Sequence, residues 1–408
     1  MTTFTGTQWL LIDLASRYGK DKLPFSERLT FGENFLPYLM VDSLEELTES
    51  LTPWLEQAKD KEMFAGCALA LWDTYQGRNS SWQVGQDQCA SGPQLLSVLL
   101  KCETGMKNTG AIGTEVPDPY TVIANTMGVE ADRSKVKKAT VPHVYGSTAV
   151  PMAVWGDEYD KFLAAYTETV PMAQMAKELM IDTWDSEATY HEWDMPDGAI
   201  AHNKVLTTVK KRGYPLGKHT YTYQYSEIGT KEKGSIGTKS NSASTTHSYD
   251  GFMLRELNRR CNYDFKVEEC IQLLKNPSLI GLPCEGLQRL ESLYKRFNQV
   301  SVVAIEYLNK DSLINLSKGY RAKLLVILEE VVQWPPFEIK NVHDDFMCLP
   351  NHVNRMKFWF QELLVETYQS NWWMDVYSKL TSEDHSYLKE EPKEEIIQQI
   401  RLAQYSIG

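Results

Sequence analysis

The hydrophobic pattern of the first 180 residues is typical of helices. Apolar positions recur there with a helical period, which predicts helices at 9–14, 44–58, 63–75, 94–100, 118–127, 132–147 and 155–181. One short strand is expected to end near Asp87, just before Gly92 and Pro93 open the helix at 94–100.

A different pattern follows between Leu216 and Thr246. Tyr221, Tyr223 and Tyr225 alternate with other residues, after which glycine, serine and threonine dominate. Alternation with a period of two is typical of strands. The stretch therefore predicts a β-ribbon with an exposed polar tip.

The helical pattern returns over 250–332 and ends at Pro335 and Pro336, which cannot continue a helix. Two short apolar runs, 337–342 and 346–349, then flank a His-Asp-Asp turn and predict a hairpin. The remainder is expected to be helical to the end. The sequence thus predicts a predominantly helical α+β fold with a small antiparallel sheet and no internal repeat.

Length and composition describe an ordinary globular protein. The 408 residues suffice for two or three lobes, and 42% are hydrophobic and 24% charged. No basic residue precedes the first apolar stretch, and the longest apolar runs, 63–72 and 324–328, are too short to span a membrane. Seven scattered cysteines without a CxxC pair indicate reduced thiols and argue against a structural zinc site.

Charge is distributed unevenly along the chain. The net charge of −12 argues against a simple nucleic-acid-binding domain, because phosphate contacts need cations. Between Lys204 and Lys239, however, basic residues outnumber acidic ones, whereas 45–50 and 390–395 are acidic. This indicates a middle lobe able to face a polyanion. An acidic surface that faces a basic partner is the alternative.

The most informative run is RSKVKKATVPHVYG, which spans 133–146. In a helix, steps of four residues keep Arg133, Lys137 and Tyr145 on one stripe. Two cations and an aromatic hydroxyl in that order suit a triphosphate with its nucleoside. A solvated basic helix face explains the run equally well by itself. Pro142 removes a backbone donor and predicts a kink that re-aims Tyr145.

Two aspartates could complete a site for nucleotidyl transfer. Such a reaction uses two Mg²⁺ ions roughly 4 Å apart, which need converging carboxylates. Asp87 at its strand end and Asp344 at the tip of the predicted hairpin are the candidates. Each taken alone is more often a turn former, and His343 is more often structural.

Four segments of the chain, in this order, carry a family resemblance: DQCASGPQ at 87–94, RSKVKKATVPHVYG at 133–146, HSYDGFML at 247–254 and VHDDF at 342–346. They resemble the motifs of the superfamily that includes bacterial DNA polymerase I. They are more similar to the single-subunit DNA-dependent RNA polymerases of phages and mitochondria. The closest resemblance is to the larger, palm-and-fingers subunit of the split two-subunit middle RNA polymerase of schitoviruses.

The resemblance implies a right-hand polymerase fold with a small antiparallel palm sheet. The first part of the palm is expected at 1–112, the fingers with a short specificity-type ribbon at 113–247, and the rest of the palm at 248–408. A helical insertion is expected at about 257–333. The thumb, the N-terminal domain and the family's Asp-x-Arg-Gly-Arg segment are expected to be absent from this chain.

The resemblance also implies roles in catalysis. Asp87 and Asp344 resemble the metal-binding pair, with the backbone carbonyl of Gln88 as a further ligand of Mg²⁺. Arg133 and Lys137 resemble the triphosphate-binding residues, and Lys137 could protonate the leaving pyrophosphate.

The sugar end of the site is expected to select ribonucleotides. Tyr145, with Gly146 beside it, resembles the residue that monitors the incoming sugar, and His247 resembles its partner near the ribose 2′-hydroxyl. DNA polymerases of the superfamily carry a glutamate where this chain has Gly92, which leaves room for that hydroxyl. Asp345 departs from both groups and is expected to be either a third acid near the metals or a turn residue.

The function implied is that of a catalytic subunit of a DNA-dependent RNA polymerase. It would transfer ribonucleotides from NTPs to an RNA 3′ end on a DNA template by a two-metal mechanism. Its expected place is the cytoplasm of an infected bacterial host, without a membrane. A second polypeptide supplying the thumb and N-terminal region, and a single-stranded-DNA-binding helper, are the expected partners.

Two alternatives stay open. One is a fragment of a DNA polymerase of the DNA polymerase I type. The other is a catalytically inactive structural subunit, against which the presence of both Asp87 and Asp344 argues.

Overall fold

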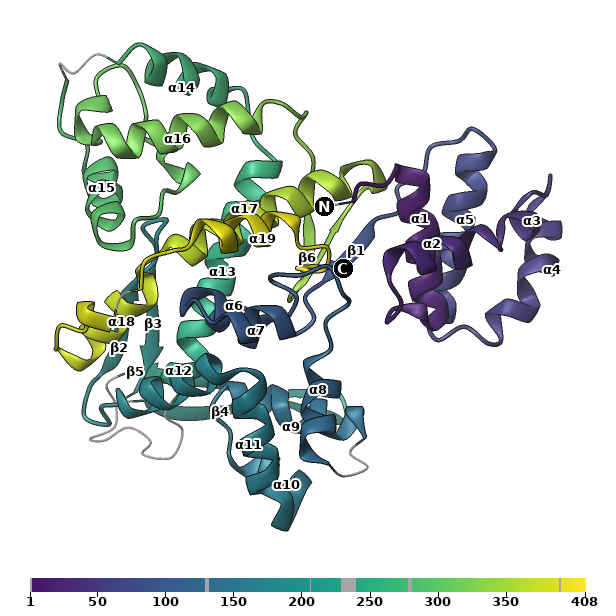
Figure 1. The fold of residues 1–408 in the computed structure, drawn as a ribbon, viewed down its shortest axis with the longest axis horizontal. Helices are drawn as coiled ribbons and strands as arrows, with labels where there is room; N and C mark the ends of the chain where they lie inside the picture. The colour runs from purple at the N-terminus through teal and green to yellow at the C-terminus, as the bar shows by residue number, and fades with distance from the viewer. Residues whose placement is uncertain (1, 129–131, 206, 229–239, 278–280, 389) are drawn as a thin grey trace.

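The computed structural model describes residues 2–128, 132–205, 207–228, 240–277, 281–388 and 390–408. Within these residues the fold is predominantly helical, with three small antiparallel sheets (Figure 1). The predicted α+β class is therefore confirmed. No helix in the described part combines the length and the apolar character that crossing a bilayer requires.

The first 75 residues form a helical lobe at one side of the molecule (Figure 1). Its elements are α1 (Gly6–Ala15), η1 (Ser16–Lys20), α2 (Phe25–Glu33), α3 (Leu36–Leu39), α4 (Leu44–Leu55) and α5 (Lys61–Tyr75). α1 begins at a capping box, in which the Thr5 hydroxyl accepts from Gln8 N and the Gln8 side chain accepts from Thr5 N. The helix then buries Trp9 and Leu10 in the core.

A three-stranded antiparallel sheet connects this lobe to the rest of the chain. Its strands β1 (Val84–Asp87), β7 (Asp345–Cys348) and β6 (Lys340–Val342) lie in the order β1-β7-β6. Asp87 pairs with Asp345, and Val342 also pairs with Asp345, so His343 and Asp344 form the hairpin tip. The predicted strand end at Asp87 and the predicted hairpin are both confirmed.

The centre of the molecule is built from helices that pack behind this sheet (Figure 1). They are α6 (Ser91–Leu99), α7 (Glu103–Asn108), α13 (Asn241–Cys261), η5 (Pro350–His352), α17 (Val353–Gln369) and α19 (Glu394–Leu402). Phe346 of β7 packs against Phe360 of α17 with ring centroids 5.5 Å apart. The hairpin is thereby fixed to the hydrophobic core.

Residues 403–408 leave the helical path and return to β1, so the prediction of helix to the end was wrong for this segment. Gly408 N donates to Asp87 O at 2.9 Å, and the Gln94 amide donates to Ser406 O at 3.0 Å. The Tyr405 hydroxyl accepts from Phe25 N at 2.9 Å. These long-range partners replace the hydrogen bonds that a further helical turn would have supplied.

A second group of helices follows the central α6 and α7. It comprises α8 (Pro119–Met127), α9 (Arg133–Val144), α10 (Ala149–Trp155), η2 (Gly156–Glu158), α11 (Tyr159–Thr169) and α12 (Pro171–Asp182). The single helix predicted over 155–181 was wrong, because it is split at Val170. Pro171 lacks a backbone donor and holds Val170 out of the helical conformation, at φ −139° and ψ 65°.

Two hairpins follow α12. The first, β2 (Tyr190–Asp194) with β3 (Ile200–Lys204), was not predicted, although Pro196-Asp197-Gly198 is a typical turn sequence. The second is β4 (Thr207–Leu216) with β5 (His219–Ile228). The predicted ribbon therefore exists, but it begins earlier than 216.

The end of the predicted ribbon was placed wrongly. Residues 229–239 lie outside the described part, and α13 already begins at Asn241. The Thr245 and Thr246 hydroxyls donate to Asn241 O and Ser242 O within the helix, at 2.8 and 3.0 Å. Bonds of this kind let a threonine-rich segment be helical where its composition indicates a loop.

The helical pattern predicted for about 257–333 is confirmed. After α13 it forms α14 (Lys266–Lys275), α15 (Glu285–Phe297), η3 (Val302–Glu306), η4 (Leu313–Asn315) and α16 (Lys318–Val331). Two further elements, α18 (Trp372–Thr381) and η6 (Ser386–Leu388), lie between α17 and α19. Buried charges join this lobe to the centre. Glu256 of α13 accepts from Val302 N of η3 at 2.7 Å. Within the centre, Arg260 of α13 pairs with Glu366 of α17 at 2.7 Å.

A buried polar contact fixes α9 against α12. His143 Nε2 lies 2.8 Å from the Gln174 amide oxygen and 3.0 Å from Lys177 Nζ. Burial, followed by the charge of Lys177, lowers the pKa of His143 to about 4. Burial also lowers the pKa of Lys177 to about 8.

His143 should make a destabilising contribution that grows as the pH falls from 6.5 to 4. Over this window the unfolded chain binds a proton at His143 that the folded chain does not, which removes up to about 3 kcal/mol. Melting temperatures of wild type and His143→Gln, measured between pH 7 and 4.5, test this. As the pH falls, His143→Gln should lose less stability than wild type or gain more, whereas the exposed His219→Gln should match wild type. Equal slopes in all three proteins would contradict the assignment.

Candidate active site

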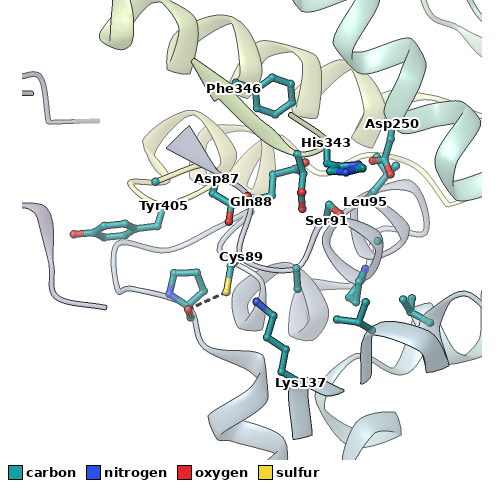
Figure 2. Close-up of a pocket in the computed structure, with 18 of the residues that line it drawn as sticks. Asp87, Gln88, Cys89, Ser91, Leu95, Lys137, Asp250, His343, Phe346 and Tyr405 are labelled. Carbon is teal, nitrogen blue, oxygen red and sulfur yellow. Dashed lines mark hydrogen bonds between the residues drawn. The ribbon is translucent and has the colours of Figure 1, made fainter. Parts of the chain in front are cut away.

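One cavity of about 730 Å³ gathers almost all the residues singled out from the sequence (Figure 2). Its walls include Asp87, Gln88, Gly92, Arg133, Lys137, Tyr145, His247 and Asp344. Gly146 is not part of the lining. It has φ +94° directly after the end of α9, so its role there is to turn the chain.

Two carboxylates meet where β1 and the β6–β7 hairpin end. The Gln88 N–H donates to Asp344 O at 3.3 Å, which ties the residue after Asp87 to the hairpin tip. Enclosure in the cavity, followed by the charges of Asp344 and Asp345, raises the pKa of Asp87 to about 6. Asp87 and Asp344 both line the cavity, at the adjoining ends of β1 and the hairpin.

This donor set fits a hard divalent cation. The described residues contain no cluster of three or more histidine, cysteine or acidic side chains that would enclose a metal. Mg²⁺ is commonly held by one or two carboxylates together with substrate phosphates and water, so two carboxylates open to a cavity suffice. The Gln88 side chain donates through Nε2 to Gln94 at 2.8 Å, and the Gln88 backbone carbonyl could add a further ligand.

Asp345 precedes Phe346 on β7, so its side chain lies on the opposite face of the sheet. It is not part of the cavity lining. Burial raises its pKa, and the charge of Arg17 in the N-terminal lobe opposes that rise. A side chain at Gly85 would collide with it, because a Cβ there would lie 2.6 Å from Asp345 Oδ1. Asp345 is thus a strand residue and not part of the turn. It pairs with Asp87 and its charge contributes to raising the pKa of Asp87, so the expectation of a third acid near the metals stays a prediction.

Two cations of α9 face the carboxylates across the cavity. α9 begins at Asp132, whose side chain accepts from Ser134 N at 3.0 Å. Arg133 and Lys137 follow on one side of the helix, 5.3 and 5.7 Å from the centre of the Tyr120 ring. Figure 2 shows Lys137 pointing towards Cys89 and Asp87, and its charge opposes the rise in the Asp87 pKa.

Arg133 is held by a partner that the sequence reasoning missed. Its Nε donates to Asp118 at 2.6 Å, and Asp118 also accepts from Thr121 N and its hydroxyl at the start of α8. An arginine has five N–H donors, so this pair leaves others for a ligand. The Asp118-Pro119 sequence indicates a helix start, but nothing local connects Asp118 to Arg133.

The helix that carries Arg133 and Lys137 ends earlier than predicted. The helix stops at Val144, and Tyr145 follows as its C-cap residue at φ −92° and ψ 17°. Its position relative to Lys137 is therefore set by the helix end. The kink expected at Pro142, two residues before that end, stays a prediction.

Tyr145, His247 and Gly92 form the other wall. The Tyr145 and His247 rings stack with centroids 4.5 Å apart and planes at 24°. A Cβ at residue 92 would lie 3.1 Å from the Tyr145 hydroxyl oxygen, so glycine lets the ring approach. Burial, followed by the charge of Asp250, raises the pKa of Tyr145 to about 12.

A further acid in this wall was quoted in a motif but given no role. Asp250 lies 4.0 Å from His247 Nδ1. Burial, followed by the charge of Asp344, raises the pKa of Asp250 to about 7. Lys22 of the N-terminal lobe also lines the cavity, and its charge lowers the pKa of Asp87. The sequence carries no signal that would have placed Lys22 there.

Comparison with known proteins bears on this geometry. Residues 2–155 match the family model of DNA-dependent RNA polymerases. A stretch of 122 residues is 30% identical to the DNA-directed RNA polymerase of Enterobacteria phage T3, covering 29% of this chain and 14% of that protein. The chain thus matches only a small part of that relative's length. Both comparisons support a DNA-directed RNA polymerase.

The family match and the cavity overlap only in part. The predicted site residues from Asp87 to Gly146 lie inside the matched range, whereas His247 and Asp344 lie beyond it. The fold brings these two later residues to the same cavity as the matched ones. The assignment of His247 and Asp344 to the site therefore depends on their position in the cavity.

Proposed function

We propose that this chain is the catalytic subunit of a DNA-directed RNA polymerase, which adds ribonucleotides from NTPs to an RNA 3′ end under the direction of a DNA template. The observation that carries the proposal is convergence. Four sequence segments separated by up to about 260 residues line one cavity, in which carboxylates face cations. In this proposal 1–112 and 248–408 form the palm and 113–247 the fingers.

The carboxylates and the cations have different roles in nucleotidyl transfer. Asp87 and Asp344, with the Gln88 carbonyl, would hold Mg²⁺, which when bound activates the attacking oxygen and stabilises the leaving one. Arg133 and Lys137 bind the triphosphate and offset its charge. The Lys137 ammonium is also placed to give a proton to the leaving pyrophosphate.

The wall formed by Tyr145 and His247 receives the sugar. Stacking holds both rings in fixed positions, so their polar atoms can contact a ribose 2′-hydroxyl. Gly92 leaves space beside the Tyr145 hydroxyl. A site that hydrogen-bonds a hydroxyl discriminates against a substrate without it, because its own polar groups are then left unpaired. This favours an enzyme that uses ribonucleotides over a fragment of a DNA polymerase.

Replacing Asp344 should abolish RNA synthesis. Asp344→Asn removes a carboxylate charge from the cavity, and we expect a loss of about 10³-fold or more, in line with other electrostatic contributions to catalysis. Asp345→Asn is the matched control, because it alters the neighbouring acid, which does not line the cavity. This variant should keep most activity. The readout is extension of a labelled RNA primer annealed to single-stranded DNA. Extension by Asp344→Asn at the wild-type rate would exclude Asp344 from catalysis, and no extension by wild type would favour an inactive structural subunit.

Adding a methyl group at residue 92 should weaken sugar selection. Gly92→Ala places a Cβ 3.1 Å from the Tyr145 hydroxyl and must displace that ring. We expect the ratio of kcat/KM for ATP to that for dATP to fall by about tenfold or more. Tyr145→Phe, which keeps the ring and removes the hydroxyl, separates loss of position from loss of the polar group. An unchanged ratio in both variants would exclude this wall from sugar selection.

A second polypeptide is expected to complete the enzyme, as in the split polymerases of schitoviruses. We expect it to supply a thumb and N-terminal region, with a single-stranded-DNA-binding helper assisting on duplex templates. The complex would act in the cytoplasm of an infected bacterium.

Gel filtration and a processivity assay of the purified chain test this partnership. We expect the isolated chain to release RNA after short additions, because the thumb that would hold the product duplex is expected on the second polypeptide. A processive, fully active monomer would contradict the proposal.

A further inference from the structure

The pairing register of the β4–β5 ribbon sorts its side chains into two faces. Lys210 pairs with Tyr225, Arg212 with Tyr223, and Tyr214 with Tyr221. Directly paired residues of antiparallel strands share a face, and so do alternate residues of one strand. One face, here the tyrosine face, therefore consists of Lys210, Arg212, Tyr214, Tyr221, Tyr223 and Tyr225. The other, the threonine face, consists of Lys211, Gly213, Pro215, Thr220, Thr222 and Gln224.

The rings of the tyrosine face are exposed to solvent. Tyr214, Tyr221, Tyr223 and Tyr225 are 63, 59, 57 and 37% exposed. These values exclude a role in the hydrophobic core. The Tyr223 and Tyr225 rings are nearly parallel, with planes at 26° and centroids 6.1 Å apart. The face is thus a row of aromatic planes that the rest of the fold leaves open.

Cations accompany the rings. Arg212 lies directly opposite Tyr223, and Lys210 pairs with Glu227 at 2.6 Å. Lys218 in the turn and Lys211 on the threonine face are also exposed. The ribbon is basic although the whole chain has a net charge of −12. Attraction of a polyanion is therefore concentrated at this part of the surface.

The combination of aromatic planes and cations selects one kind of ligand. Bases stack on aromatic side chains irrespective of sequence, since every base has a π face, and cations follow the phosphates. Within a duplex those π faces are covered by neighbouring base pairs, and recognition uses the base edges in the grooves. A row of exposed rings thus fits unpaired bases better than a double helix.

We propose that the tyrosine face is a stacking platform for an unpaired nucleic-acid strand. The inference deepens the proposed function and rests on it, because a polymerase that copies DNA handles two such strands, the DNA template and the RNA product. Both present the same chemistry to the platform. Cross-strand pairs also stabilise an isolated ribbon. The test must therefore separate binding from folding.

The test compares matched substitutions on the two faces of β5. Tyr221→Thr/Tyr223→Thr/Tyr225→Thr removes the rings and keeps residues that favour strands. The control, Thr220→Ala/Thr222→Ala/Gln224→Ala, changes the threonine face at alternating positions of the same strand. Fluorescence anisotropy with labelled dT and U oligonucleotides, and with a duplex of the same length, gives Kd for each protein. Circular dichroism and melting temperature check the fold.

We expect the tyrosine variant to raise Kd for an unpaired strand by about tenfold or more, since several stacked bases lose their partners. The control should stay within about twofold of wild type. Tighter binding of dT or of U by wild type identifies the template or the product as the ligand. Equal losses in both variants, no loss in either, or tighter binding of the duplex would overturn the platform.

Two further measurements keep the proposal testable if the triple variant does not fold. Tyr223→Thr alone should weaken binding, and Arg212→Gln should reduce the slope of log K against log salt by about one. Wild-type affinity in Tyr223→Thr with an unchanged fold would overturn stacking by the rings, and an unchanged salt slope in Arg212→Gln would exclude its contact with the phosphates.

Failure of the platform and failure of the proposed function remain distinguishable, because binding is measured without NTPs or divalent ions. RNA synthesis by wild type without ring-dependent binding would overturn the platform alone. Ring-dependent binding by a chain that makes no RNA would overturn the proposed function alone.

Discussion

The site depends on holding two like charges together. Asp87 ends β1 and Asp344 stands at the hairpin tip beside it, and their repulsion contributes to raising the pKa of Asp87 to about 6. The backbone overcomes this repulsion with bonds on several sides: the ladder between β1 and β7, the Gln88 N–H to Asp344 O, and the Gly408 N–H to Asp87 O. A bound divalent cation would remove the repulsion. The sheet is therefore organised to receive positive charge.

Arg133 and Lys137 of α9 place positive charge on the opposite wall of the cavity. Their placement depends on contacts away from the cavity: His143 fixes α9 to α12, and Asp118 holds Arg133 from α8. A triphosphate with its metal ions would lie between negative and positive walls. Function in this proposal follows from that separation of charge, with little covalent work left to the protein.

The sequence predicted the parts of the site that have local signals. The strand end at Asp87, the hairpin around Asp344 and the α9 helix all follow from apolar periodicity and proline stops close by. Their convergence on one cavity could be predicted only through the family resemblance, since periodicity does not place distant segments. The family match covers the residues from Asp87 to Gly146 and ends before His247 and Asp344.

The errors have physical causes. The start of α13 was taken for ribbon because serine and threonine favour loops, yet their hydroxyls bond within the helix. The return of 403–408 to β1 and the Asp118–Arg133 pair depend on contacts that no local pattern reveals. Asp345 was weighed as a third acid near the metals or as a turn residue; it is a strand residue paired with Asp87, and the charge of Arg17 acts on it.

The most direct measurement of the central claim is a crystal structure with Mn²⁺ and a non-hydrolysable NTP, read by anomalous scattering. Metal between Asp87 and Asp344, with the triphosphate on Arg133 and Lys137, is the result expected here. Metal or triphosphate bound elsewhere, with these four side chains unliganded, would contradict it.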